Sequence, residues 1–189
     1  MTLERTQMSV STSKNSKNHR FVEYLAGFVE REDRGALATL RRGLRRPAGE
    51  VPALYLYLGP WIPDKEDSSP QEADLFLVAE LFALWHQGKS HPDLTGNNIG
   101  EALRQLSIAT GKQAATEHRL LALLQCPRED LDTGLHGIIS LLRSHNIPVD
   151  WPQLLTDLQF WDKDTRKIQQ RYARAFWRSR PESETSSPT

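Results

Sequence analysis

The residues of this chain that could carry acid–base or metal chemistry are scattered along the sequence. No two of the six histidines have the i, i+4 spacing that presents two metal ligands on one helix face; they are His19, His86, His91, His118, His136 and His145. The acid pairs Asp130/Asp132 and Asp162/Asp164 are two residues apart, which places their members on different helix faces. The sequence therefore predicts no metal site and offers no ready acid–base pair.

Motifs for nucleophilic and cofactor chemistry are missing as well. The single cysteine, Cys126, precedes Pro127 at the end of the apolar run LLALLQC, where a free cysteine usually serves as a small buried hydrophobe. The sequence has no G-x-x-x-x-G-K-[ST], G-x-G-x-x-G or G-x-S-x-G motif. We therefore expect a protein without a cofactor and without catalytic activity.

The charged residues are strongly segregated, although the formal net charge is zero. Six arginines lie between Arg31 and Arg46, seven lysines and arginines lie between Lys163 and Arg180, and seven acids face one lysine between Glu50 and Glu80. Such blocks are often only solvated surfaces, but basic blocks also attract polyanions and acidic blocks attract basic partners.

The basic blocks have helical spacing. On a last helix, five cations fall within an arc of about 80° and form a stripe suited to a nucleic-acid backbone; they are Lys163, Lys167, Arg171, Arg174 and Arg178. A second helix, from Asp33 to about Arg46, turns three leucines to the core and spreads five arginines over its other surface: Arg34, Arg41, Arg42, Arg45 and Arg46. Cations near a helix C-terminus also complement its dipole without any ligand.

Four aromatic residues are candidates for stacking on bases, although most such residues in a chain of this size belong to the core. They are Tyr55, Tyr57, Trp61 and Trp177.

Apolar residues recur at helical spacing between two Ser/Thr-rich tails, residues 1–17 and 181–189. Asp33, Ser69, Asn98 and Asp150 are expected N-caps, and Gly88 an expected left-handed stop. Residues 54–58 (LYLYL) fit either a strand or a short helix. We predict an all-α fold of about eight to nine helices in two helical lobes, residues 18–88 and 99–180, joined by a linker at 89–98.

Four segments in order resemble the CasB family, the small subunit of the type I-E CRISPR Cascade complex. They are GALATLRRG at 35–43, NIGEALR at 98–104, TEHRLLALL at 116–124 and LLRSHNIPVDWPQLLTDLQFW at 141–161. The resemblance implies an all-α, non-catalytic subunit, present as two copies, that stabilises the R-loop by holding the displaced non-target DNA strand. It also implies contacts with the guide RNA–DNA hybrid and with the backbone and large subunits. The basic residues inside the matched segments are Arg41, Arg42, Arg104, Arg119 and Arg143.

Two other functions stay open at this point. One is a pure protein-interaction scaffold whose arginines pair with acidic neighbours, and the other is a helical nuclease with carboxylates from separate helices. No apolar run reaches the roughly 20 residues that a membrane span needs, and a lone cysteine fits a reducing compartment. We therefore expect a cytoplasmic protein without a membrane partner.

Overall fold

The structure, a computed structural model, describes residues 17–62, 70–163 and 165–178. Residues 17–30 are helical, and eight further α-helices follow: α2 (Arg34–Arg41), α3 (Tyr55–Leu58), α4 (Pro70–Trp85), α5 (Ile99–Thr110), α6 (Gln113–Gln125), α7 (Leu131–Ser144), α8 (Trp151–Gln159) and α9 (Lys167–Trp177). Short 3₁₀ turns lie at Pro52–Leu54, Gly59–Trp61 and Arg128–Asp130. Within these ranges no β-strand forms, so the predicted all-α class and helix number are confirmed.

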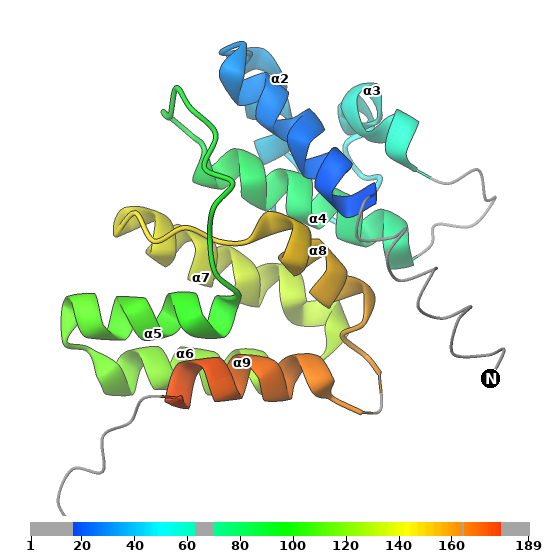
Figure 1. Cartoon of the computed structure of the whole chain (residues 1–189). Helices are drawn as coiled ribbons and strands as arrows, with labels where there is room; N and C mark the ends of the chain where they lie inside the picture. Colours follow the sequence, from blue (N-terminus) through cyan, green and yellow to red (C-terminus); the bar gives the residue numbers. More distant parts are fainter. Residues whose placement is uncertain (1–16, 63–69, 164, 179–189) are drawn as a thin grey trace, which may run out of the picture.

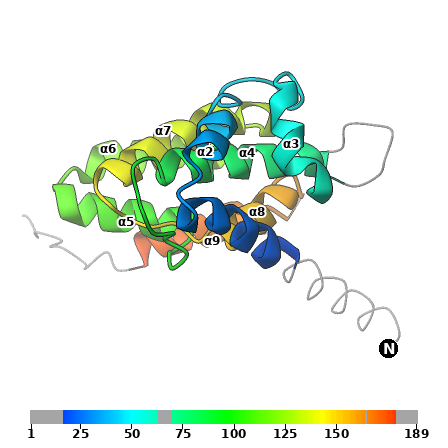
Figure 2. The same cartoon turned by 90° about the horizontal axis from the view of Figure 1, so that it is seen from above.

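Helix α4 is the centre of the molecule. It packs against α2 on one side and against α7 and α8 on the other, an arrangement visible in Figures 1 and 2. Eleven of its sixteen residues are buried, including Trp85, and even Glu72, Asp74 and Glu80 lie inside. A helix that is covered on several faces loses the usual apolar stripe and is apolar nearly all round.

Three of the four expected N-caps are confirmed. The side chain of Asp33 accepts a hydrogen bond from Ala36 N (2.9 Å), that of Asn98 from Glu101 N (3.2 Å), and that of Asp150 from Gln153 N (2.9 Å). Each bond satisfies a backbone donor that the first helical turn leaves free. The fourth expected cap, Ser69, and the two tails apart from Lys17 lie outside the described residues.

Helix α2 is shorter than predicted, because it ends at Arg41 and not near Arg46. Residues 42–45 form turns, and Arg45 has a positive φ of 66°. A Cβ atom on Gly43 would collide with the side chains of Glu80 and Leu54. The chain leaves the helix here because it passes closely over α4, a tertiary contact that helical periodicity does not reveal.

The run at 54–58 is helical, as α3 with its two flanking 3₁₀ turns. Its aromatic rings pack inward or against neighbours: Tyr57 lies edge-on to Phe28 with ring centroids 5.6 Å apart, and Trp61 lies 5.3 Å from Phe21. With Pro52 before it and Gly59-Pro60 after it, a helical turn keeps the aromatic residues on the core without needing a partner strand.

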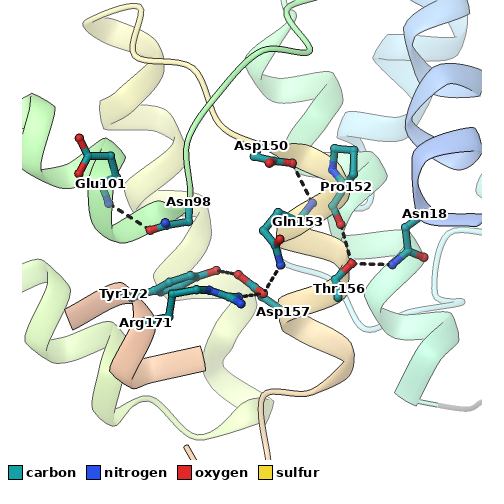
Figure 3. A network of polar contacts seen from close by, with 10 residues as sticks. All are labelled: Asn18, Asn98, Glu101, Asp150, Pro152, Gln153, Thr156, Asp157, Arg171 and Tyr172. Carbon is teal, nitrogen blue, oxygen red and sulfur yellow. Dashed lines mark hydrogen bonds and ion pairs between the residues drawn. The ribbon is translucent and has the colours of Figure 1, made fainter. Parts of the chain in front are cut away.

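The segment at 89–98 is fastened at its end. Asn97 forms an isolated parallel bridge with Val149, through Asp150 N donating to Asn97 O (3.0 Å) and Asn97 N donating to Pro148 O (3.5 Å). A Cβ atom at Gly96 would collide with the backbone of Val149. The bridge places the caps of α5 and α8, Asn98 and Asp150, next to each other (Figure 3).

One buried polar network joins α8 to α9. The carboxylate of Asp157, fully buried, accepts hydrogen bonds from Tyr172 OH (2.7 Å) and Gln153 Nε2 (2.8 Å) and pairs with Arg171. All three side chains point toward Asp157 in Figure 3. Helix α9 also approaches α5 so closely that a Cβ atom at Gly100 would collide with the backbone of Tyr172.

The hydrophobic core continues through both predicted lobes, from Phe21 at one end to Phe176 at the other. Because no break in the core marks a boundary between residues 18–88 and 99–180, the division into two lobes stays a prediction. None of the described helices is long and apolar enough to cross a bilayer.

His86 closes the C-terminal end of α4 as a neutral ring. Its Nδ1 donates to Phe82 O (2.9 Å), and its Nε2 accepts from Asp93 N (2.9 Å). Burial lowers the pKa of His86 to about 4, and the nearby Lys89 lowers it further against the effect of the two backbone hydrogen bonds. The ring thus links the last turn of α4 to the segment that follows it.

The pKa of His86 predicts a pH-dependent stability. Because the folded pKa lies below the unfolded value of 6.5, the neutral ring stabilises the fold above pH 6.5, and this contribution is lost as pH falls toward 4. We expect the unfolding free energy of the wild type, relative to His86→Gln, to fall by about 3 kcal/mol over that range. Urea denaturation of both proteins at several pH values measures this. A constant difference would contradict the prediction.

Candidate nucleic-acid interface

Two arginines from distant parts of the chain meet at the C-terminal end of α4. Arg41 of α2 donates from Nη1 to Ala83 O (3.2 Å), and Arg143 of α7 donates from Nη2 to Gln87 O (2.9 Å). Ala83 O is a carbonyl that the last turn of α4 leaves free, Gln87 O lies two residues beyond the helix, and both cations complement the helix dipole. Burial lowers the pKa of Arg41, and the like charge of Arg143 lowers it further.

Two more cations lie beside this pair. Arg34, Arg41 and Lys89 line one surface cavity of about 380 Å³, together with Gln87 and Gly88. Lys89 Nζ lies 4.2 Å from the ring centroid of Trp85 and 3.7 Å from Asp93, and Arg34 lies 3.8 Å from Glu32. We call Arg34, Arg41, Lys89 and Arg143 the α4-end cluster.

The α4-end cluster has the features of a phosphate-binding surface. Each guanidinium has five N–H donors, and the helix-end bonds of Arg41 and Arg143 use only one each. The ion pairs of Arg34 and Lys89 are long and at least partly exposed, so they are weak and exchange readily with another anion. The remaining donors suit the oxygens of a nucleic-acid backbone, which carry no sequence information.

Lys89 was missed by sequence reasoning, which assigned residues 89–98 to a linker. It follows Gly88, whose positive φ of 83° confirms the expected left-handed stop. A cation directly after such a stop is placed near the end of the helix dipole, and this could have identified it.

The other arginines that follow α2 are turned elsewhere. Arg42 is exposed, and its guanidinium group has no hydrogen bond or ion pair within the described ranges. Arg45 and Arg46 line a different cleft, with acidic residues of α4 and α7. The early end of α2 therefore divides the five arginines that a longer helix would have spread over one surface.

Arg104 and Arg119 do not join the cluster. Arg104 donates to Glu101 on its own helix, from Nε (3.0 Å) and Nη2 (2.6 Å), which neutralises its charge locally. Arg119 is exposed, donates to Ala115 O (3.1 Å) and lines a cavity of about 740 Å³ between α6 and α7.

The predicted stripe on the last helix is interrupted. Lys163 lies before α9, with Nζ 4.2 Å from the ring centroid of Phe160, and not on the helix itself. Arg171, expected to be unpaired, forms an ion pair with buried Asp157. Lys167, Arg174 and Arg178 are exposed and remain candidates.

Two structural arginines also escaped sequence reasoning. Arg128 donates to Leu158 O (2.5 Å), Pro70 O (3.2 Å) and Asp74 Oδ1 (2.5 Å), and so connects α4 with α8. Arg166, at a positive φ of 45°, donates to Leu124 O. These contacts join residues far apart in the sequence, so local spacing gives no sign of them.

The aromatic rings that were candidates for stacking on bases contact other aromatic rings of the chain. Tyr55 packs on Phe76 at 5.2 Å and donates to Glu72, and Trp177 lies 5.3 Å from Phe176. Tyr57, Trp61 and Trp177 pack against the hydrophobic core, which supports the core interpretation for these three rings, whereas Tyr55 is 40% exposed.

The structure offers little for catalysis. Among the residues it describes, no three His, Cys, Asp or Glu side chains are grouped so that they could hold a metal ion. Cys126 is half-buried, and burial raises the pKa of its thiol, with a further rise from Asp130, Asp132 and Glu129. A raised pKa disfavours the thiolate that a nucleophile requires.

Comparisons with known proteins identify the family of this chain and agree with its all-helical fold. The family described as CRISPR-associated protein Cse2 matches residues 36–177, and the chain belongs to this family. A protein described as CRISPR-associated protein Cse2 from Thermus thermophilus is 28% identical over 163 residues, which are 86% of this chain and 90% of that protein.

Solved structures give the same result. The crystal structure of CasB from Thermus thermophilus has a TM-score of 0.72 and 27% identity, covering 86% of this chain and 98% of the other. That of M. ruber CasB has a TM-score of 0.67 and 29% identity, covering 86% and 93%. A chain of a CRISPR RNA-guided surveillance complex shares the fold, with a TM-score of 0.72 at 21% identity, covering 88% and 93%. The resemblance to CasB inferred from four sequence segments is confirmed.

Substituting Lys167, at the start of α9, and Arg171, in its middle, should have different effects on the free energy of unfolding. Arg171→Gln leaves the buried Asp157 carboxylate without its cation, and we expect it to lower the unfolding free energy by about 1–2 kcal/mol, a figure reduced for the 43% exposure of Arg171. Lys167→Gln, an exposed change of the same charge, should alter it by less than about 0.5 kcal/mol. Urea denaturation at pH 7 compares them, and equal effects would contradict a structural role for Arg171.

Proposed function

We propose that this protein is a non-catalytic small subunit of a CRISPR RNA-guided surveillance complex of the Cascade type. Membership of the Cse2 family supports the assignment, and so does the similarity to CasB structures. The fold shared with a chain of a surveillance complex is consistent with it. The expected partners are the backbone and large subunits, a second copy of this chain, and the guide RNA–DNA hybrid, in the cytoplasm.

The molecular task that we propose is to hold the displaced DNA strand without reading its sequence. The α4-end cluster carries this proposal, because it gathers four cations on the surface and fixes two of them by bonds to helix carbonyls. Strand exchange between a DNA duplex and a guide hybrid is nearly balanced in free energy, so a few backbone contacts can shift it. Contacts to phosphates suit a strand whose sequence changes with every guide.

A scaffold without nucleic-acid contact is the second candidate function. The observation that favours it is the neutralisation of several predicted DNA-binding cations within the chain, by Glu101 at Arg104 and by Asp157 at Arg171. In that case the basic surface would meet acidic neighbours in the complex. Charge reversal would then impair assembly and leave strand binding unchanged.

The strand-holding function is tested with Arg34 and Lys89, which hold no helix carbonyl. The double variant Arg34→Gln/Lys89→Gln is placed in a reconstituted complex on target DNA, and the permanganate reactivity of displaced-strand thymines is followed as salt increases. Loss of two single-strand phosphate contacts should make the slope of log binding constant against log salt concentration shallower by about 1.4. The displaced-strand thymines of the variant should therefore become reactive at lower salt than those of the wild type. Assembly is checked by size-exclusion chromatography.

The matched control is Arg20→Gln/Lys112→Gln, which removes two exposed cations outside the cluster. This control should keep the salt dependence of the wild type. If the cluster variant assembles and shields the strand as the wild type does, the strand-holding function fails and the scaffold function is favoured.

A further inference from the structure

A second cleft, with the opposite charge, lies between the turn after α2, the buried helix α4 and the beginning of α7. Its volume is about 840 Å³. Seven carboxylate residues line it: Glu72, Asp74, Glu80, Glu129, Asp130, Asp132 and Asp162. Three arginines line it as well: Arg45, Arg46 and Arg128. The lining therefore has a clear excess of negative charge, part of which comes from the acidic block at residues 50–80.

Glu80 is the unusual member of this lining. Its residue is only 4% exposed, yet within the described part of the chain its carboxyl group forms no hydrogen bond and no ion pair. Gly43 leaves the space that this side chain occupies, since a Cβ atom there would collide with Oε1 of Glu80. A buried carboxyl group without a partner is costly, so its retention calls for a function or a ligand.

The arginines of the cleft do not satisfy its carboxylates. Arg128 pairs with Asp74 Oδ1 (2.5 Å) and lies 3.7 Å from Asp162, but Asp74 Oδ2 is buried and has no hydrogen-bond partner. Arg45 and Arg46 line the cleft without an ion pair to any described carboxylate. One buried acceptor in this cleft, Asp74 Oδ2, therefore lacks a donor among the described residues, and none of these residues bonds to the nearly buried carboxyl group of Glu80.

We propose that this cleft binds an arginine or lysine side chain of a partner protein, inserted between α4 and α7 toward Glu80. A long cationic side chain matches three features: the excess of carboxylates, the volume of the cleft, and the nearly buried carboxyl groups of Glu80 and Asp74 in its lining. The inference does not depend on strand binding, because Arg41, Arg143 and the cavity beside them contribute nothing to this cleft.

Binding in this cleft is coupled to a proton. Burial raises the pKa of Glu80 to about 8, and the negative charge of Asp132 raises it further, so the empty cleft holds Glu80 protonated at neutral pH. An inserted cation favours the carboxylate, and the proton leaves to solvent as the ion pair forms. Affinity for the cation therefore increases as pH rises toward 8 and then levels off.

Other charged groups lie around Glu80. From the turn after α2 these are Arg45 and Arg46, and from α7 they are Asp132 and His136. The pKa of His136 is lowered from 6.5, mainly by burial and also by Arg45, and so moves away from that of Glu80. On α4 itself, the pKa of Asp74 is raised by burial to about 6, which also separates it from Glu80.

The experiment uses the full-length chain and a fluorescein-labelled peptide of Gly, Ser and spaced Arg residues, with a citrulline peptide of the same length as the neutral control. Fluorescence anisotropy gives the Kd between about pH 6.5 and pH 8.5. We expect the Arg peptide to bind on the order of tenfold more tightly at the upper pH. Glu80→Gln, which resembles the protonated form, should bind weakly without this pH dependence, and Asp132→Asn should also weaken binding.

Glu23→Gln, at an exposed position on the first helix, is the matched control and should behave as the wild type. The proposal would be overturned if the Arg and citrulline peptides bound equally, or if neither bound. It would also be overturned if Glu80→Gln kept the pH profile of the wild type. Tighter binding of spermine than of the peptide at Glu80 would instead assign the cleft to free polyamines. Thermal denaturation establishes that each variant is folded.

Discussion

The burial of α4 on several faces is the constraint on which the rest of this structure depends. The last carbonyls of an α-helix have no donor within the helix, so other groups supply donors here. Arg41 and the ring of His86 bond to carbonyls of the last turn, and Arg143 bonds to the carbonyl of Gln87 just beyond the helix. Because the donors are guanidinium groups, satisfying the helix end also gathers positive charge at one place on the surface. The basic cluster is thus a by-product of folding that can serve in binding.

Much of the fold could be predicted from the sequence, because it is locally determined. Asp33, Asn98 and Asp150 act as caps within three residues of their acceptors, and apolar periodicity marks the amphipathic helices. The candidate site was only partly predictable. Arg41 was identified, but nothing in its local sequence shows that it lies near Arg143, which is half the chain length away. The end of α2 likewise depends on a distant contact, that of Gly43 with Glu80. The predicted stripe on the last helix gave no sign that Asp157, from another helix, pairs with Arg171.

The two clefts show how a chain of zero net charge can present two opposite surfaces. On one side, cations satisfy helix carbonyls and leave further donors exposed to solvent. On the other, carboxylates lie in a cleft where Asp74 Oδ2 has no donor among the described residues and the carboxyl group of Glu80 is almost fully buried. Both arrangements involve α4, at its C-terminal end and along its length. The distribution of charge, and not its sum, therefore decides which partners such a subunit can accept.

The small bridge between Asn97 and Val149 determines how the second half of the chain comes apart. It holds the first residues of α5 and α8 together, and α5 in turn packs closely on α9 through Gly100. Breaking the Asn97–Val149 bridge exposes the first turns of α5 and α8 together and weakens the packing of α9 on α5. The C-terminal helices should therefore exchange their amide hydrogens as one cooperative unit, with protection that rises and falls together, and not helix by helix.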